Sequence, residues 1–363
     1  MGLQIIRPGT RINFLKMRYG AFLVSGLLIL AGLLSLVVKG GPQMGIDFSG
    51  GMIIQIKFDQ QVELSRVQQA LQGANLPGLG VQRFGTAQDN EFLVRTSASD
   101  LVSDAVRRDI QTNLDQNLAG IDFEVQRLEM VGPRVGADLR AQAMEALFYA
   151  ILLIAIYISG RFEQRWFPAM VIAAGLTGGI AALRWLGLPM ELLIVAALLI
   201  TIGLCWKLKL SYALGAVVAL VHDVFITLGV FSLLNKDLDL AIIAAFLTII
   251  GYSLNDTIIV YDRIRENIRD KVDMTLPKVI NLSINQTLSR TILTSGTTLM
   301  VVLCLVLLGG GVIHDFALAL LIGIAVGTFS SIFIASPILL GLSKIADVDL
   351  EAEANQEAET VAV

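Results

Sequence analysis

The sequence predicts an α-helical polytopic membrane bundle that carries a small α+β domain of ferredoxin-like topology outside the membrane. Hydrophobic residues make up 55% of the 363 residues, charged residues only 16%, and the mean hydropathy is +0.71, whereas about a quarter of a soluble domain is charged. The apolar residues gather in runs of membrane-spanning length. Residues 42–135, between the first two runs, instead mix polar and apolar residues at strand and helix spacing.

The first apolar run, residues 19–38, is followed by Lys39-Gly40-Gly41-Pro42. A helix of about 20 apolar residues crosses the ~30 Å hydrocarbon core of a bilayer. Because the run is too long for a typical signal-peptide core and lacks a small-residue cleavage pattern, it is predicted to be a retained span. Seven further runs, which complete a set of eight candidate spans, lie in a predicted bundle over 141–342: 144–159, 167–186, 189–206, 211–233, 240–259, 292–313 and 315–342.

Lysine and arginine residues predict the orientation of the chain. Among the short segments that flank the apolar runs, they gather in 1–18, 161–165, 207–209 and 263–278, whereas the intervening short loops hold Arg184 and Lys236. The positive-inside rule therefore places both termini in the cytoplasm and residues 42–135 outside, in the periplasm. The C-terminal tail, residues 343–363, is acidic and rich in alanine, and it is predicted to be disordered.

The external segment has the pattern of alternating strands and helices. The predicted elements are a strand at 52–58, a helix at 62–76, strands at 80–84 and 91–95, a helix at 99–118 and a strand at 123–128. The order βαββαβ is that of a ferredoxin-like unit. The segment contains no histidine and no nucleophile–base or metal-ligand spacing. It is therefore predicted to bind or dock rather than to catalyse a reaction, and no catalytic residue or metal site is expected.

Charge and cysteine content exclude other classes. A net charge of -4 is not that of a nucleic-acid-binding protein. The two cysteines, Cys205 and Cys304, both lie inside apolar runs, so they indicate neither a disulfide framework nor a metal cluster.

Glycine-rich and polar motifs open and close the external domain and interrupt the later apolar runs. The first is Gly45-Ile46-Asp47-Phe48-Ser49-Gly50-Gly51, in which Gly45, Asp47, Phe48, Gly50 and Gly51 are the candidate functional residues. The others are Val131-Gly132-Pro133-Arg134-Val135-Gly136-Ala137-Asp138-Leu139, Gly251-Tyr252-Ser253-Leu254-Asn255-Asp256, Asn285-Gln286-Thr287-Leu288-Ser289-Arg290-Thr291 and Thr294-Ser295-Gly296-Thr297-Thr298. In this order, around an external domain of this size, the motifs closely resemble the SecF family, the smaller membrane subunits of the SecDF accessory complex of bacterial protein export. The family is related to the resistance-nodulation-division (RND) superfamily.

The resemblance implies an accessory subunit of the Sec translocase that uses a proton or sodium gradient, without any bound cofactor, to promote late translocation and release of secreted proteins. It implies no enzymatic activity. The implied partners are SecD, the SecYEG translocon, unfolded secretory polypeptides and membrane lipids, with no nucleic acid. The implied location is the bacterial cytoplasmic (inner) membrane.

About residues 162–209 fall outside the resemblance, because members of the family usually carry six spans. Residues 191–203 parallel 239–251, and residues 167–183 resemble 212–228 more loosely, so we infer a duplicated helix pair. In the copy, Thr177-Gly178 stands where the other pair has His222-Asp223, so the copy lacks these polar residues. It is predicted to be a peripheral, lipid-facing hairpin without chemistry of its own.

Asp256 and Asn255 follow an apolar helix, and Arg290 is predicted to begin the next span. A charge near the bilayer centre costs at least ~2.5–3.5 kcal/mol on insertion scales, so such residues pair with one another or line a wet path. Arg290 is therefore the expected partner of Asp256. The resemblance implies that this aspartate and this arginine take part in proton passage. The alternative is a static ion pair that fixes helix packing.

His222 and Asp223 lie in the middle of the predicted span 211–233. Because histidine titrates near neutral pH, the pair is a candidate proton relay. An interhelical hydrogen bond without any relay function explains the pair equally well.

Two other functions share the predicted bundle. RND-type exporters of drugs or lipids carry two large external domains per chain, whereas this chain has one. A passive assembly scaffold for the translocon is the second alternative, and it would tolerate loss of the Asp256 charge.

Overall fold

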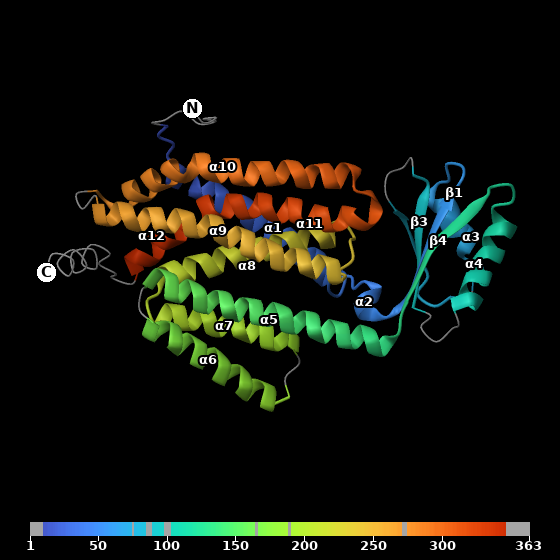
Figure 1. Cartoon of the computed structure of the whole chain (residues 1–363), viewed down its shortest axis with the longest axis horizontal. Coiled ribbons are helices and arrows are strands. Elements are labelled where there is room, and N and C mark those ends of the chain that lie inside the picture. The colour runs from blue at the N-terminus through green and yellow to red at the C-terminus, as the bar shows by residue number, and fades with distance from the viewer. Residues whose placement is uncertain are drawn as a thin grey trace.

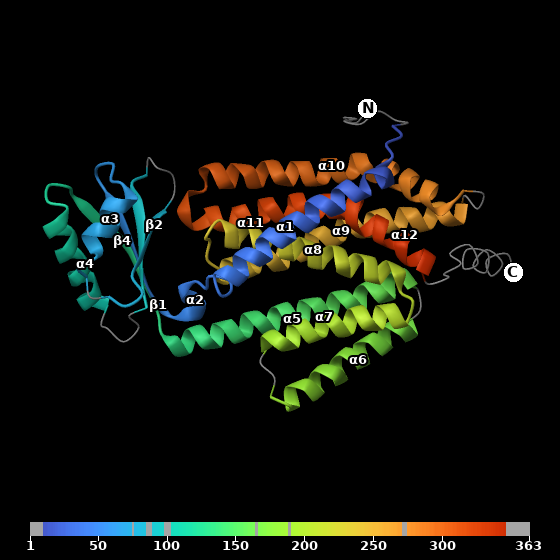
Figure 2. The same cartoon turned by 180° about the vertical axis from the view of Figure 1, so that it is seen from behind.

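The computed structural model describes residues 10–74, 76–84, 89–97, 103–163, 166–187, 190–270 and 274–345. A helical bundle forms one end of the molecule and an α+β domain forms the other (Figure 1). Figure 2 shows the same two parts from behind. The fold is therefore the membrane bundle with an attached α+β domain that the sequence predicts.

The bundle is built from long, mostly apolar helices. They are the short 3₁₀ turn η1 (Phe14–Met17), α1 (Arg18–Val38), α5 (Pro133–Glu163), α6 (Trp166–Trp185), α7 (Met190–Lys207), α8 (Ser211–Leu233), α9 (Leu240–Asp270), α10 (Leu276–Leu308), α11 (Gly310–Ser330), a π-helical turn η2 (Ser331–Ala335) and α12 (Ser336–Ile345). Within the described residues, six helical segments are long and apolar enough to cross a membrane, while α6 and α7 contain shorter apolar stretches, 173–183 and 192–207. The sequence predicts eight spans, and the two that do not meet this length and hydropathy among the described residues are α6 and α7.

Several helices extend beyond the apolar runs that predict them. The helix α9 continues to Asp270, and α10 already begins at Leu276, ahead of the predicted start at 292. The predicted end of that span at 313 is wrong, because α10 ends at Leu308 and α11 begins at Gly310. Polar residues extend a helix beyond its apolar stretch when they are outside the bilayer, and hydropathy alone does not register them.

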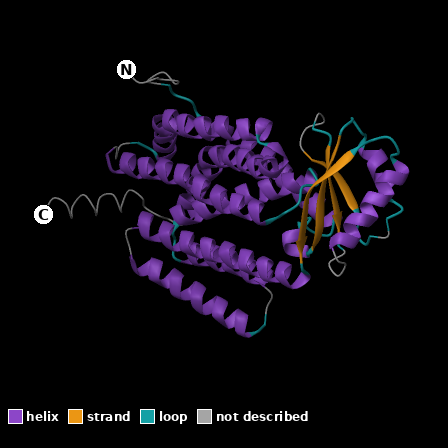
Figure 3. Cartoon of the chain, turned by 45° about the vertical axis from the view of Figure 1, so that its right-hand side comes forward, coloured by secondary structure: helices purple, strands orange, loops and turns teal. Residues whose placement is uncertain are grey.

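The α+β domain contains the four strands of the described residues, which Figure 3 shows gathered in one sheet. The sheet is antiparallel, in the order β2-β3-β1-β4. The strands are β1 (Gly51–Phe58), β2 (Gly80–Phe84), β3 (Glu91–Thr96) and β4 (Phe123–Val131), and the helices are α3 (Leu64–Leu71) and α4 (Ser103–Asn117). This order confirms the predicted ferredoxin-like topology. The predicted start of the second helix, at 99, lies outside the described residues.

One face of the sheet and both helices share a hydrophobic core. Alternate residues of β1 point into it, since Met52, Ile54 and Ile56 are completely buried. The period of two places successive side chains on opposite faces of a strand. Val67 of α3 and Ile110 of α4 pack against the same core. The domain therefore has a hydrophobic core of its own, separate from that of the bundle.

Small residues let the bundle helices approach closely. Gly32 of α1 faces Gly229 of α8, and a Cβ atom on Gly32 would lie 2.6 Å from the Cα of Gly229. A Cβ atom on Gly327 of α11 would lie 2.9 Å from the Cβ of Ser253 on α9. Glycine and serine at helix contacts are typical of membrane bundles. Because lipid tails are themselves apolar, helices there associate through close backbone packing rather than through the hydrophobic effect.

The hairpin α6–α7 lies at the edge of the bundle, where it packs against α5 (Figures 1 and 2). Met170, Val195 and Leu199 are among its exposed apolar side chains. The hairpin thus presents an apolar outer surface, as expected of a peripheral, lipid-facing pair.

Candidate functional site

Helix α9 carries two buried polar side chains that bond to different neighbouring helices. Ser253 faces α8 and α11, and Asp256, nearly one turn later, faces α10. Their exposed fractions are only 3% and 2%. A helix that is apolar through most of its length thus supplies polar groups to two separate sites.

The first site is formed by Asp256 and Ser295 of α10. The hydroxyl of Ser295, itself 1% exposed, donates a hydrogen bond of 3.0 Å to the Oδ2 atom of Asp256. This is the one hydrogen bond that the described residues make to the Asp256 side chain. A buried carboxylate has room for about four hydrogen bonds, so Asp256 retains most of its capacity to accept a proton or to bind a cation.

Arg290 lies on α10, but its side chain is exposed and, within the described part of the chain, forms no ion pair with Asp256. The expected pairing of these two residues is therefore wrong. Both residues lie inside helices rather than at helix ends, because α9 and α10 are longer than their apolar runs. Asn255 is also exposed, on the side of α9 that points away from the bundle.

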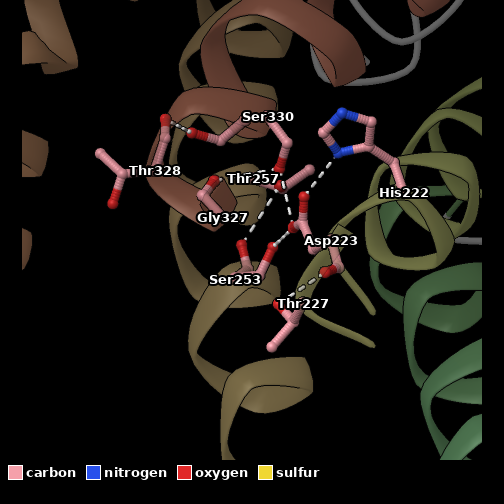
Figure 4. A network of polar contacts seen from close by, with 9 residues as sticks. His222, Asp223, Thr227, Ser253, Thr257, Gly327, Thr328 and Ser330 are labelled. Atoms are coloured by element: carbon pink, nitrogen blue, oxygen red, sulfur yellow. Dashed lines mark hydrogen bonds and ion pairs between the residues drawn. The ribbon is translucent and has the colours of Figure 1, made fainter. Parts of the chain in front are cut away.

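The second site surrounds Asp223 of α8 (Figure 4). The hydroxyls of Ser253 and Ser330 donate to the Oδ2 atom of Asp223 over 2.5 and 2.8 Å, and the Nδ1 atom of His222 lies 2.8 Å from Oδ1. Asp223 is 1% exposed and Ser330 is completely buried. The site thus joins α8, α9 and α11.

The ring of His222 uses only one of its nitrogens in this network. Its side chain is 7% exposed, and its Nε2 atom is buried without a hydrogen-bond partner among the described residues. His222 and Asp223, which the sequence predicts as a candidate proton relay, therefore form a hydrogen-bonded group with Ser253 of α9, and no hydrogen bond among the described residues joins this group to Asp256.

The glycine-rich motif lies at the junction between the α+β domain and the bundle. It forms the short helix α2 (Ile46–Ser49), which lies next to the start of α5 (Figure 1). Gly50 and Gly51 have φ values of +71° and +129°. A Cβ atom on Gly51 would also lie 2.5 Å from the carbonyl oxygen of Thr96. Both the backbone conformation and the space therefore require glycine at this position.

Residues of the motif also hold the N-terminus of α9. The Oδ2 atom of Asp47 accepts a hydrogen bond of 3.0 Å from the amide of Leu240, and the amide of Gly45 donates to the carbonyl of Leu238 over 2.7 Å. Phe48 is 5% exposed and packs in a core cluster with residues of α5, α8 and α9. The motif thus connects β1, α5 and α9 at one point.

A second connection joins the α+β domain to the α8–α9 turn. Arg95 of β3 forms an ion pair with Asp237 in that turn. Burial raises the pKa of Asp237 above its ordinary value, while Arg95 lowers it. Burial also raises the pKa of the neighbouring Asp239, whose Oδ1 atom caps α9 by accepting a hydrogen bond from the amide of Ile242.

The serines of both sites, Ser253, Ser295 and Ser330, were not predicted as site residues, nor were Arg95 and Asp237. Ser253 and Ser295 lie inside motifs that the sequence analysis singled out, so their position was a usable signal. Ser330 lies 107 residues from Asp223 in an apolar run, and a single serine there gives no signal of its own.

Comparison with known proteins identifies families that match this chain. The family model "Protein export membrane protein SecD/SecF, C-terminal" matches twice, over residues 110–207 and 200–345. The model "SecD/SecF GG Motif" matches residues 35–62. The same model thus matches both α5–α7 and α8–α12. This double match supports the inferred duplication of a helix pair.

Curated relatives resemble the chain over nearly its full length. "Protein translocase subunit SecF" of Calditerrivibrio nitroreducens is 38% identical over 92% of this chain and 95% of its own length. The subunit of the same name from Desulfurispirillum indicum is 40% identical over 91% of each chain, and that of Escherichia coli O157:H7 is 36% identical over 95% of this chain and 92% of its own length.

Among solved structures, SecDF of Thermus thermophilus, described as a translocon-associated membrane protein, superposes with a TM-score of 0.67 and 30% identity over 93% of this chain. A structure of SecDF in the super-membrane-facing form superposes with a TM-score of 0.55 and 28% identity over 99% of this chain. The match covers 40% and 41% of those longer chains.

Proposed function

The chain belongs to the SecF family of protein-export membrane proteins, and on that premise we propose that it uses an ion gradient, of protons or sodium ions, to drive late translocation and release of secreted proteins. As a member of the family it is a multi-pass membrane protein and an accessory subunit of the Sec protein translocase. The observation that carries the proposal is Asp256, a buried carboxylate with a single hydrogen bond in the middle of a membrane helix. It can exchange a proton because most of its accepting positions are unused.

The distribution of positive charge supports the orientation of the subunit. Arg7, Arg11, Lys16 and Arg18 precede the first span, and further Lys and Arg residues follow α5 and end α9. The described ends of these segments, at the start of α1, the end of α5 and the end of α9, lie at the end of the bundle away from the α+β domain (Figure 1). By the positive-inside rule that end is cytoplasmic, and the α+β domain is periplasmic.

A polar stripe on the outside of α9 and α10 supports an incomplete bundle. Asn255, Arg290, Thr294 and Thr297 are exposed, and they lie within or next to apolar helical segments. Polar residues inside a membrane almost always face another helix or a water-filled cavity rather than lipid. We assign this stripe to contact with SecD, because the SecDF chains that superpose on this one are far longer than it.

The native Cys304 allows a direct test of that contact, since it is exposed on α10 at helical spacing from Arg290, Thr294 and Thr297. A membrane-permeant maleimide is expected to label Cys304 in the isolated chain and to label it much less when SecD is bound. Cys205, which is buried, serves as the unreactive control. Equal labelling of Cys304 with and without SecD would place SecD elsewhere.

The contacts at the root of the α+β domain supply a way to transmit movement. A change in proton occupancy at Asp256 changes the packing of α9 against α10. Because Asp47 holds the first amide of α9 and Arg95 pairs with the turn before it, a displacement of α9 moves the α+β domain. Repeated movement of a periplasmic domain biases an emerging unfolded chain against sliding back.

The test is export of a secretory protein into membrane vesicles that contain SecYEG and SecD with this chain, in the presence and absence of an ion gradient. Asp256→Asn is expected to reduce gradient-dependent export to the level measured without the chain, and Arg290→Ala to reduce it strongly. Asp262→Asn is the matched control, because Asp262 lies on the same helix but is paired with Arg161 at 2.6 Å. If Asp256→Asn and Arg290→Ala both assemble and export like the wild type, the chain is a passive scaffold. Assays with a proton gradient alone and a sodium gradient alone identify the coupling ion.

A further inference from the structure

The buried pair His222–Asp223 has features that the proposed role of Asp256 does not require. We propose that His222 and Asp223 form a second proton-binding site, contained within this chain, in which the Nε2 atom of His222 takes up the proton. The site deepens the proposed function, because a second proton carrier within the bundle extends the path beyond Asp256. Its proton binding can be measured independently of export.

The hydrogen bonds around Asp223 determine which nitrogen of His222 is available. An ionised carboxylate only accepts hydrogen bonds, and the Oδ2 atom of Asp223 already accepts from Ser253 and Ser330. The Nδ1 atom of His222, 2.8 Å from Oδ1, therefore carries a hydrogen and donates it. In the neutral ring the other nitrogen, Nε2, then has a free lone pair, and a neutral imidazole of this tautomer accepts its next proton there.

The surroundings of Nε2 offer it no competing donor among the described residues. The atom is buried and has no hydrogen-bond partner there. Most buried polar atoms in native structures have a partner, so an unpaired one calls for a functional explanation. Uptake of a proton uses the lone pair that the packing leaves free.

Charge balance favours proton uptake at this site. With a neutral His222 and an ionised Asp223 the site has a net charge of one negative unit, and protonation of Nε2 brings it to zero. The helices that pack on α8 carry no charged residue over 19–38, 146–160, 192–206 and 316–343, and α9 carries only Asp256 over 240–261. The other titratable side chains on these segments and on α8 are tyrosines and cysteines: Tyr19, Tyr149, Tyr157, Cys205, Tyr212, Tyr252, Tyr261 and Cys304 of neighbouring α10. An uncompensated charge inside a bilayer is costly, and a bound proton removes it.

The chain contains an internal control for this site. His314 and Asp315 form the same adjacent pair, with Nδ1 and Oδ1 2.9 Å apart, but their side chains are 35% and 31% exposed. Asp315 there is also paired with Lys236 at 2.6 Å. The same dipeptide thus occurs once in a buried site without a cation and once at a surface with one.

The test uses the fact that the chain has two histidines. The His314→Gln variant, labelled with ¹⁵N-histidine and reconstituted with SecD in lipid, reports His222 alone by nitrogen NMR. We expect Nδ1 to be protonated throughout, and Nε2 to change reversibly from unprotonated to protonated as the pH is lowered. The same change is expected in the Asp256→Asn background, which separates this site from the one in the proposed function.

Two variants distinguish a proton carrier from a hydrogen bond that only supports packing. Asp223→Asn removes the charge that balances the imidazolium, so protonation of Nε2 is expected to be lost over the same pH range. His222→Asn keeps a donor toward Asp223 but has no second nitrogen. It is expected to preserve assembly while lowering gradient-dependent export severalfold. The proposal is overturned if His222 keeps one proton over the whole pH range in the His314→Gln variant, or if His222→Asn exports as well as the wild type.

Discussion

The helix pairs α6–α7 and α8–α9 resemble one another in sequence but differ in what they bury. In α6–α7 the buried side chains are almost all apolar, among them Leu176, Leu193 and Ala197. Its buried Thr201 donates to Ala197 of its own helix, at 2.7 Å. In α8–α9, by contrast, Asp223 and Asp256 accept hydrogen bonds from other helices.

This difference shows that a helix pair of this kind packs onto the bundle without buried carboxylates. The carboxylates of α8–α9 are therefore not a requirement of packing, and their cost in the membrane indicates a function. The turns of the two pairs also differ. The α8–α9 turn contacts the α+β domain through Asp237 and Leu238, whereas the apolar hairpin lies against α5 at the edge of the bundle (Figure 2). The pair that holds the carboxylates is the pair that is joined to the α+β domain.

The largest expected effect is on the stability of the protein, and it distinguishes Asp223 from Asp256. Asp223→Ala leaves two buried donors without an acceptor, on Ser253 and His222, because Ser330 can still donate to the carbonyl of Gly327 at 3.1 Å. Asp256→Ala leaves one, on Ser295. Each unsatisfied buried group costs about 1–3 kcal/mol. Asp223→Ala is therefore expected to lower the free energy of unfolding by about 1 kcal/mol or more beyond the loss in Asp256→Ala. Unfolding in mixed micelles measures both losses, and equal losses would mean that Asp223 is not the acceptor for this network.

An intermediate effect is expected at the start of α9. Asp47→Ala and Asp239→Ala each remove one hydrogen bond to a backbone amide of the first turn, so each is expected to cost about 1 kcal/mol of stability. Only Asp47 belongs to the root of the α+β domain. Asp47→Ala is therefore expected to lower gradient-dependent export more than Asp239→Ala at matched stability. Equal export by the two variants would argue against transmission through Asp47.

A smaller effect is expected when the pH changes the contact between the α+β domain and the α8–α9 turn. Burial raises the pKa of Asp237 above its ordinary value of 3.8, so the docked state binds a proton more readily than a state in which the residue is exposed. Docking is then most stable below that ordinary value and weakens as the pH rises through the raised pKa of Asp237. Limited proteolysis at the root of the α+β domain, measured against pH, is expected to show this slope in the wild type. Asp237→Asn is expected to flatten it, and an unchanged slope in that variant would assign the pH dependence to Asp239, whose pKa is raised in the same direction.

The smallest effect is expected in the apolar hairpin. Thr177, at the position that corresponds to His222, is exposed on α6. Thr177→Leu is expected to change the free energy of unfolding by no more than about 0.5 kcal/mol, as exposed substitutions usually do, and to leave export unchanged. A large loss of export in this variant would give the hairpin a function of its own and break the contrast between the two pairs.

The fold could be predicted from the sequence to a large extent, because its signals are local. An apolar run of sufficient length predicts a span wherever it occurs, and alternation in residues 52–58 predicts a buried strand. Asp223 and Asp256 stand out for the same reason, as acids inside apolar runs. The residues that bond to them do not stand out in the sequence, because a hydrogen bond such as that from Ser330 depends on how the helices pack.

The wrong expectation for Arg290 also has a physical cause. Arg290 was expected to pair with Asp256 because one residue follows an apolar run and the other was predicted to begin the next, but both helices extend further and the arginine side chain is exposed. The role of Asp47 could not be predicted, since its partner, the amide of Leu240, lies 193 residues away.

The central claim is that proton occupancy at Asp256 moves the α+β domain relative to the bundle. Paired spin labels at Asp115 on α4 and at Val38, which is 84% exposed at the end of α1 nearest that domain, measure this movement in a chain without native cysteines. In the complex with SecD, the account predicts that Asp256→Asn, which mimics the protonated state, shifts the distance distribution, and that Asp262→Asn does not. An identical distribution in the wild type and in Asp256→Asn, with and without an ion gradient, would contradict it.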